Sequence, residues 1–330
     1  MSRRRRADRL PTTRAYAGHG DWPLVTTDPA AAQAMKAAVG RQGIWTARFD
    51  FHPAPAVRDA AAELESLGYG AVWLGENIGR EPFLLSSMVL AATQHLVAAT
   101  GIASIHARDA AATTAAQLTL TEAHPGRFLL GVGVSHAPLV QRRRGVYGPP
   151  VTTMRNYLDA MDESATAYRA VRPPHTPLRL LAALGPRMLA LAAEHADGAH
   201  TYLAPPQHTA DARAILGPDA ILAAEQAVVL DPAPSSGREL ARAHLRRYLS
   251  FANYTKHLRR LGFTDDDLTG NGSDRLIDTL VASGDQDTIA ERAQEHLTAG
   301  ADHVCIQVLT ADSHSLPTAQ WRELAGIAPV

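Results

Sequence analysis

The chain of 330 residues alternates eight short apolar runs with longer stretches of helical periodicity. Apolar runs bounded by turn signals are typical of buried parallel strands. Eight of them, most followed by a helical stretch, predict a (β/α)8 TIM barrel. The C-terminal ends of the strands are then the expected place for functional residues. The runs are Ile44–Asp50, Ala71–Glu76, Thr100–His106, Phe128–Ser135, Leu178–Ala183, Ala199–Leu203, Glu225–Leu230 and Asp302–Leu309.

The connections between the runs are mostly the length of one helix. Val57–Leu67 repeats apolar residues at helical spacing, and Gly68 suits its C-terminal cap. Residues 231–300 are too long for one such connection, so we expect the main insertion between strands seven and eight. Its pattern predicts helices at Arg238–Leu261, Leu276–Ala282 and Thr288–Ala299.

Residues 1–40 lack a clean period, apart from a helical stretch at Ala30–Val39. We therefore expect an N-terminal arm over residues 1–40, partly disordered, and a barrel domain over residues 41–330. The arginines Arg3–Arg6 could touch nucleic acid, but terminal charge runs are usually solvated, and we favour that interpretation.

Composition narrows the class of protein. A formal net charge of -1 and a pI near 7.0 give no electrostatic reason to bind nucleic acid or an anionic membrane. No apolar run approaches the roughly 20 residues that a membrane span needs. The single cysteine, Cys305, excludes an intramolecular disulfide, and the basic N-terminus has no apolar stretch behind it. We expect a cytoplasmic enzyme acting on a small molecule.

Candidate catalytic residues stand at three predicted strand ends. Strand four closes with His136, strand two with Glu76 and strand one with His52, and each type can transfer protons. His106, after strand three, is a further candidate that is more simply read as structural. Asp50-x-His52 is only a loose variant of a two-histidine metal motif, so we expect no metal.

Two glycine-containing segments suggest a ligand site. Gly131 and Gly133 lie two apart in strand four, and glycine inside a strand indicates close approach by another backbone or a ligand. After strand five, Gly185-Pro186 predicts a turn into a helix whose N-terminus could hold an anion, beside Arg187. The competing interpretation of Gly185-Pro186 is a plain turn.

Five segments in register on these strands resemble the luciferase-like monooxygenase superfamily, specifically its coenzyme F420-dependent oxidoreductases. The resemblance covers about residues 44–310 and leaves the first forty residues outside. The segments are Glu65–Glu76, Thr100–Ile105, His124–His136, Ala193–Ala199 and Ala299–Val304.

The resemblance implies cofactor contacts in three groups. Gly75 would face the ligand after strand two, and a bulge at Ala103, Ser104 and Ile105, often a non-proline cis peptide, would support the deazaflavin ring. Gly133, Val134, Ser135 and His136 would line the ring, whereas Ala183, Leu184, Gly185 and Pro186 would hold its phosphate-bearing tail. A sugar-phosphate-oxidising branch of the family has a glutamate where His136 stands, so that substrate class is disfavoured.

The resemblance thus implies hydride transfer between C5 of the deazaflavin and a small organic substrate, with His136 as the proton donor and His52 or His106 as substitutes. The alternative cofactor is FMN, in a monooxygenase of the same fold. A catalytically silent ligand-binding barrel is the third hypothesis. We also expect a homodimer.

Overall fold

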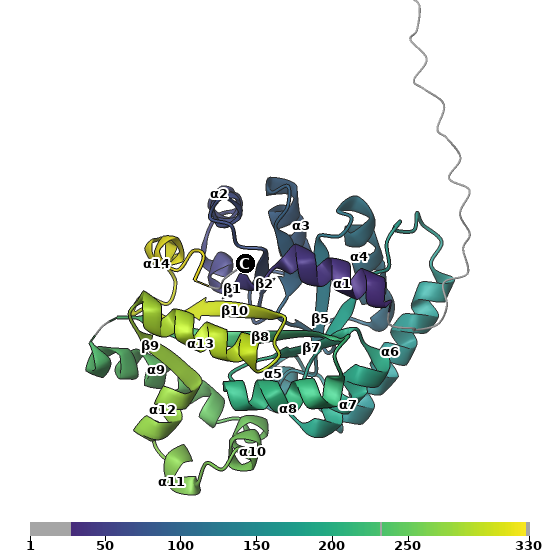
Figure 1. The fold of residues 1–330 in the computed structure, drawn as a ribbon. Coiled ribbons are helices and arrows are strands. Elements are labelled where there is room, and N and C mark those ends of the chain that lie inside the picture. The colour runs from purple at the N-terminus through teal and green to yellow at the C-terminus, as the bar shows by residue number, and fades with distance from the viewer. Residues whose placement is uncertain (1–27, 232, 328–330) are drawn as a thin grey trace, which may run out of the picture.

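Eight parallel strands close into a barrel in the computed structural model, which describes residues 28–231 and 233–327. Following the order β10-β1-β2-β3-β5-β6-β7-β8, each strand pairs with its neighbour, and β10 pairs with both β1 and β8 to complete the ring. Helices surround the strands (Figure 1). The expected (β/α)8 barrel is confirmed.

The described helices and strands have these bounds. The strands are β1 Gln42–Thr46, β2 Ala71–Leu74, β3 Val97–Thr100, β4 Ala103–Ser104, β5 Phe128–Gly133, β6 Arg179–Ala182, β7 Gly198–Thr201, β8 Ile221–Leu230, β9 Val281–Gly284 and β10 His303–Val308. The helices are α1 Pro29–Val39, the 3-10 helix η1 Arg48–Phe51, α2 Ala54–Ser66, α3 Pro82–Ala92, α4 Ala110–Ala123, α5 Ala137–Arg142, α6 Pro150–Ala167, α7 Pro186–His195, α8 Pro206–Leu216, α9 Pro234–Leu249, α10 Ala252–Arg260, α11 Asp265–Leu268, α12 Asp274–Leu280, α13 Gln286–Thr298 and α14 Thr318–Glu323.

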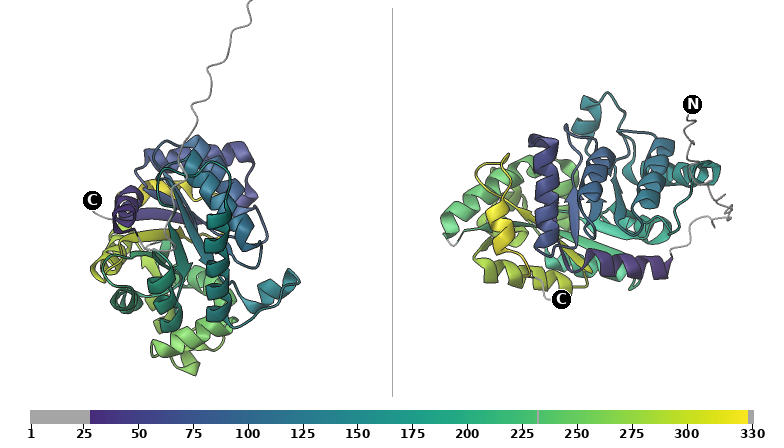
Figure 2. Two further views of the ribbon diagram at one scale, coloured as in Figure 1. Left: turned by 90° about the vertical axis from the view of Figure 1, so that its right-hand side faces the viewer. Right: turned by 90° about the horizontal axis from the view of Figure 1, so that it is seen from above.

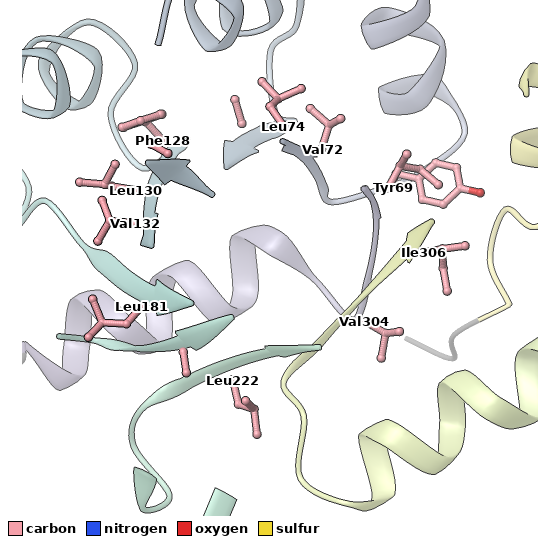
Figure 3. Packing of buried hydrophobic residues seen from close by; sticks show 14 of the residues in the cluster. Tyr69, Val72, Leu74, Phe128, Leu130, Val132, Leu181, Leu222, Val304 and Ile306 are labelled. Atoms are coloured by element: carbon pink, nitrogen blue, oxygen red, sulfur yellow. The ribbon is translucent and has the colours of Figure 1, made fainter. Parts of the chain in front are cut away.

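Alternate residues of each strand face the surrounding helices. Val72, Leu130, Leu181, Leu222 and Val304 belong to one buried cluster that packs the outside of the barrel against the helical ring (Figure 3). Successive side chains of a strand point to opposite faces, so the residues between them point inward.

Helix α1 covers the N-terminal end of the barrel (Figure 1). Its Ala32, Met35 and Val39 form one buried cluster with inward-facing strand residues such as Trp73 and Leu180. Asp28 accepts hydrogen bonds from the amides that begin this helix. The predicted helix at Ala30–Val39 is confirmed, and it packs on the barrel; residues 1–27 of the expected arm, with Arg3–Arg6, lie outside the described residues.

The expected insertion lies between β8 and β10, and Figure 2 shows its light-green helices grouped beside the barrel. Two details of the prediction were wrong. Arg238–Leu261 is not one helix, because α9 ends at Leu249 and α10 begins at Ala252. The helix expected at Leu276–Ala282 ends at Leu280, because β9 then pairs with the C-terminal half of β8.

Four barrel strands, β1, β3, β7 and β8, begin earlier than their apolar runs suggested, and the difference is largest in β3 and β8. β3 starts at Val97 and β8 at Ile221, ahead of the expected Thr100 and Glu225. In each case the extra residues pair with a neighbouring strand, so the ladder sets the boundary. Among the described helices, none is both long and apolar enough to cross a membrane.

Candidate active site

A cavity of about 850 Å³ opens at the C-terminal ends of the barrel strands. This volume is within the range usual for cofactor and ligand sites. Most of the residues singled out from the sequence line it: Gly75, Glu76, Gly133, Val134, Ser135, His136, Ala183, Leu184, Gly185 and Pro186. They come from the ends of β2, β5 and β6, which the closed barrel brings to one place.

His136 is held from two sides. It follows Ser135, whose φ of 56° lies in the left-handed region and turns the chain at the end of β5. Its ring stacks on Phe251 with centroids 4.3 Å apart, and its Nδ1 lies 3.2 Å from Asn253 Oδ1. Burial lowers the pKa of His136, so the imidazole is neutral at pH 7. A neutral imidazole at the cavity wall suits a proton acceptor.

Glu76 lines the cavity, but its carboxylate is already engaged. It accepts hydrogen bonds from both terminal nitrogens of Arg108, each at 2.9 Å, and from the Ser104 amide at 2.7 Å. Arg143 lies 3.4 Å away on the other side. The carboxylate therefore ties β2 to the segment after β3, which is a poor arrangement for a free base.

The bulge after β3 lies two or three residues before the expected positions. The non-proline cis peptide joins Gly101 to Ile102, and it is this pair that lines the cavity. Ala103, Ser104 and Ile105 are buried outside the cavity lining. The expectation of a cis bond at Ala103-Ser104 or Ser104-Ile105 was wrong, because Ala103 and Ser104 form β4, whose pairing with β5 needs regular backbone.

The glycines of β5 make room for that bulge. An added Cβ at Gly131 would lie 2.1 Å from the Thr100 carbonyl oxygen, and one at Gly133 would lie 2.6 Å from Ile102 Cδ1. The close approach inferred from the glycines is therefore made by protein atoms of the neighbouring segment, although Gly133 also borders the cavity.

The other two histidine candidates lie outside the cavity lining. His52 Nε2 lies 2.9 Å from the carbonyl oxygen of His314, which lies in the loop after β10. His106 contacts the ring of Tyr147 at 5.9 Å, and burial lowers its pKa. Of the four candidate proton-transfer residues, the cavity brings together only Glu76 and His136.

An anion-binding geometry surrounds the start of α7. The helix begins at Pro186, as expected, and Gly185 caps it with extended backbone. Arg187, Lys256 and Arg260 line the same cavity, and a Cβ added at Gly185 would lie 3.5 Å from Arg260 Nη2. Within residues 28–231 and 233–327, none of these three cations pairs with a carboxylate. The helix dipole and the cations both favour negative charge here.

The insertion supplies an aromatic wall that sequence reasoning missed. Tyr248, Phe251 and Tyr254 line the cavity and contact one another at its side. The Tyr202 hydroxyl donates to Gln307 Oε1 at 2.8 Å and accepts from Tyr248 at 2.8 Å. The only sequence signal was aromatic residues at helical spacing in a region expected to be an insertion.

Beneath this wall lie two buried polar groups. Glu225 accepts the Leu203 amide through Oε2, its Oε1 has no partner, and burial raises its pKa to about 8. His200 donates from Nδ1 to the Ala223 carbonyl at 3.2 Å, its Nε2 has no partner, and burial lowers its pKa to about 4. Glu225 Oε1 and His200 Nε2 are therefore buried polar atoms without a hydrogen-bond partner among the described residues. No group of three or more metal-ligating side chains occurs in the described part of the chain.

Comparison with known proteins identifies the family. The model of the luciferase-like monooxygenase family matches residues 30–303, and the chain belongs to this family. A protein of Mycobacterium tuberculosis, provisionally assigned as a coenzyme F420-dependent oxidoreductase, is 30% identical over 169 residues. That match covers 42% of this chain and 49% of the relative, so it spans about half of the relative's length.

Solved structures share the whole fold at low sequence identity. The coenzyme F420-dependent tetrahydromethanopterin reductase of Methanopyrus kandleri superposes with a TM-score of 0.68 and 15% identity, over 87% of this chain and 97% of that one. The oxygenating constituent of 3,6-diketocamphane monooxygenase from Pseudomonas putida, solved in complex with FMN, superposes with a TM-score of 0.62 and 14% identity. The superposition covers 88% of this chain and 97% of that one. The fold is therefore shared by proteins that use either cofactor.

Proposed function

We propose that the chain is an oxidoreductase that binds coenzyme F420 in the cavity above the barrel and acts on a small organic substrate. When bound, the deazaflavin would supply hydride transfer at C5. The observation that carries the proposal is the group of three unpaired cations at the start of α7, next to the apolar cavity. A flat ring matches the apolar cavity, and a strongly anionic tail matches the three cations.

Residues at one end of the cavity would bind the tail of the cofactor, and residues at the other end would bind its ring. Gly185, Arg187 and Arg260 would hold the anionic tail by backbone amides and charge. Ile102 of the bulge and Val134 would bound the ring. These contacts come from the segments that follow β3 and β5, from the start of α7 and from α10, so binding depends on the closed barrel and on its insertion.

His136 would handle the substrate proton. It lies at the end of β5 in the cavity wall, and burial keeps it neutral at pH 7. The aromatic wall of Tyr248, Phe251 and Tyr254 would exclude water and favour an apolar or flat substrate on that side. Glu76 and His52, the other catalytic candidates, have hydrogen-bond partners that suit structural roles better.

FMN is the second candidate cofactor, because a fold neighbour was solved in complex with it. FMN also has a flat ring and a phosphate, but it carries fewer negative charges in its tail. Three unpaired cations favour the more highly charged ligand.

Titration of the purified protein with each cofactor, followed by fluorescence, tests the proposal. We expect deazaflavin binding at micromolar or better affinity and weaker FMN binding, with the difference shrinking at high salt. Tight FMN binding without deazaflavin binding would instead favour the monooxygenase. Binding of a cofactor without turnover on any substrate panel would favour a silent barrel.

A further inference from the structure

We propose that Asn253 is a positioning residue, which keeps the proton of His136 on Nδ1 and leaves Nε2 with its lone pair free at the cavity. The proposal rests on the proposed function only in the claim that His136 then transfers a proton. The hydrogen bond itself can be tested without any cofactor.

The contact joins parts of the chain that are distant in sequence. His136 ends β5, whereas Asn253 lies in the first turn of α10, just after the break between α9 and α10. Phe251 stacks on the imidazole at 12° between ring planes, and Tyr254 lies 5.5 Å from it. One short segment of the insertion therefore sets both the plane and the rotation of the ring.

The chemistry of the contact selects one tautomer. Asn253 places Oδ1, which can only accept, 3.2 Å from His136 Nδ1, so the contact is a hydrogen bond only if Nδ1 carries the proton. Nε2 then holds the lone pair, and no other hydrogen bond to His136 side-chain atoms occurs among the described residues. A lone pair in this position can accept a proton from a substrate hydroxyl.

Few groups besides Asn253 shift the pKa of His136, so the effect of Asn253 on that pKa can be measured separately. Arg247 of α9 disfavours a charged imidazole, as does burial, whereas the hydrogen bond to Asn253 favours it. Tyr254 of α10 contacts the ring, and Tyr147 after α5 donates to the carbonyl of the preceding Ser135; burial raises the pKa of both tyrosines. Both hydroxyls therefore remain neutral while His136 titrates.

Nitrogen NMR of the full chain with labelled histidine tests the tautomer directly. The signal of His136 is assigned by its loss in His136→Gln. We expect a protonated Nδ1 and an unprotonated Nε2 at pH 8, and a mixture of tautomers in Asn253→Ala. A wild-type ring protonated on Nε2 would overturn the proposal, because the amide would then be donating to Nδ1.

Asn253→Asp provides the sharper variant, because a carboxylate still accepts from Nδ1 and adds a negative charge. We expect the pKa of His136 to rise by about one to two units. Asn271→Asp is the matched control, because Asn271 accepts a hydrogen bond from Arg246 in the same insertion. Neither Asn271 nor Arg246 lines the cavity. Equal His136 pKa values in the two variants would contradict the assigned contact.

Kinetics then test the positioning role. In Asn253→Asp, the acidic limb of the pH profile of kcat/KM should move upward by the shift that NMR measures, and Asn253→Ala should lower kcat about tenfold with little change in KM. A confirmed tautomer with an unmoved pH profile would refute the positioning role. Full turnover in His136→Gln would instead refute the role of His136 in the proposed function, while the NMR result stood.

Discussion

The two ends of the barrel are built from the same strands but differ in nearly every physical property. At the N-terminal end, α1 buries Ala32, Met35 and Val39 against Trp73 and its neighbours, and the buried His303 beside them is hydrogen-bonded to Trp73 and Gly40. At the C-terminal end, the strands stop at a cavity of about 850 Å³ that is lined by cations, tyrosines and three histidines.

The contrast separates stability from function within one fold. Helix α1 closes one end with side chains of complementary shape, and close packing there contributes to folding. The other end keeps solvent-exposed cations without carboxylate partners, and beside it Glu225 and His200 each bury one polar atom without a hydrogen-bond partner, which costs stability. We therefore expect substitutions at the two ends to have different consequences.

The largest effect is expected at the cavity wall. His136→Ala should lower turnover by about 10²–10⁴-fold, because a positioned proton-transfer group contributes about that much. Deazaflavin affinity should change far less, since the tail contacts lie at the start of α7. Steady-state kinetics and fluorescence titration measure the two effects.

His52→Ala is the matched control for this prediction. His52 lies outside the cavity lining, against the His314 carbonyl, so turnover should stay near that of the unmodified protein. Equal losses in the two histidine variants would remove the basis for assigning the proton transfer to His136.

At the closed end, Met35→Ala should destabilise the fold and leave the chemistry intact. Met35 is 6% exposed within the cluster under the barrel, and removal of a buried methionine side chain costs about 2–5 kcal/mol. Urea unfolding measures the loss of stability, and cofactor titration at low temperature should give an unchanged affinity. Weakened cofactor binding in the folded variant would show that the two ends are coupled.

Arg260→Gln should weaken cofactor binding about 10–100-fold, because a hydrogen bond to a charged group contributes about 1.5–3 kcal/mol. Arg259→Gln is the neighbouring control, since Arg259 pairs with Asp265 and does not line the cavity. Titration at two salt concentrations should show a smaller salt dependence in the Arg260 variant alone. Identical affinities in both variants would argue against an anionic tail at this place.

The smallest expected effect is the contribution of the buried Glu225 to the pH dependence of stability. Burial raises the pKa of Glu225 to about 8, so the folded chain keeps this proton up to that pH, whereas the unfolded chain loses it near 4.5. The contribution of Glu225 to stability therefore falls as pH rises through this window, by at most about 1.4 kcal/mol per pH unit.

Urea unfolding at pH 6.5 and pH 8 would measure this contribution as the difference in slope between Glu225→Gln and the unmodified protein. The buried histidines, whose pKa values are lowered, are neutral in the folded chain but partly protonated in the unfolded chain at pH 6.5, so they add a slope of opposite sign that both proteins share. The exposed Glu122→Gln on α4 is the control and should keep the slope of the unmodified protein. Equal slopes in Glu225→Gln and the unmodified protein would assign the effect elsewhere.

Local patterns in the sequence were enough to predict the architecture and one part of the site. Apolar runs and helical periods report burial along a single element, so they located seven of the eight barrel strands and the start of α7 at Pro186, whereas the run Thr100–His106 meets β3 only at Thr100. Barrel closure places all strand ends together, which is why the sequence alone assigns His136 and Gly185 to one region.

The bulge at Gly101–Ile102 was decided by pairing between strands. The sequence prediction placed the bulge two or three residues later, because nothing local distinguishes Ile102 from Ala103 or Ser104. Pairing of Ala103 and Ser104 with Val132 and Gly133 settles which residues stay regular.

The sequence by itself determined the barrel, its insertion and the residues at the strand ends, because these depend on periodicity and on the fixed geometry of a closed sheet. Only the tertiary structure decided which insertion residues reach the site. Asn253 and Phe251 contact His136, more than a hundred residues away, and Arg260 lies over Gly185. Such contacts depend on how α9 and α10 fold back across the barrel, and no local period in the chain encodes that packing.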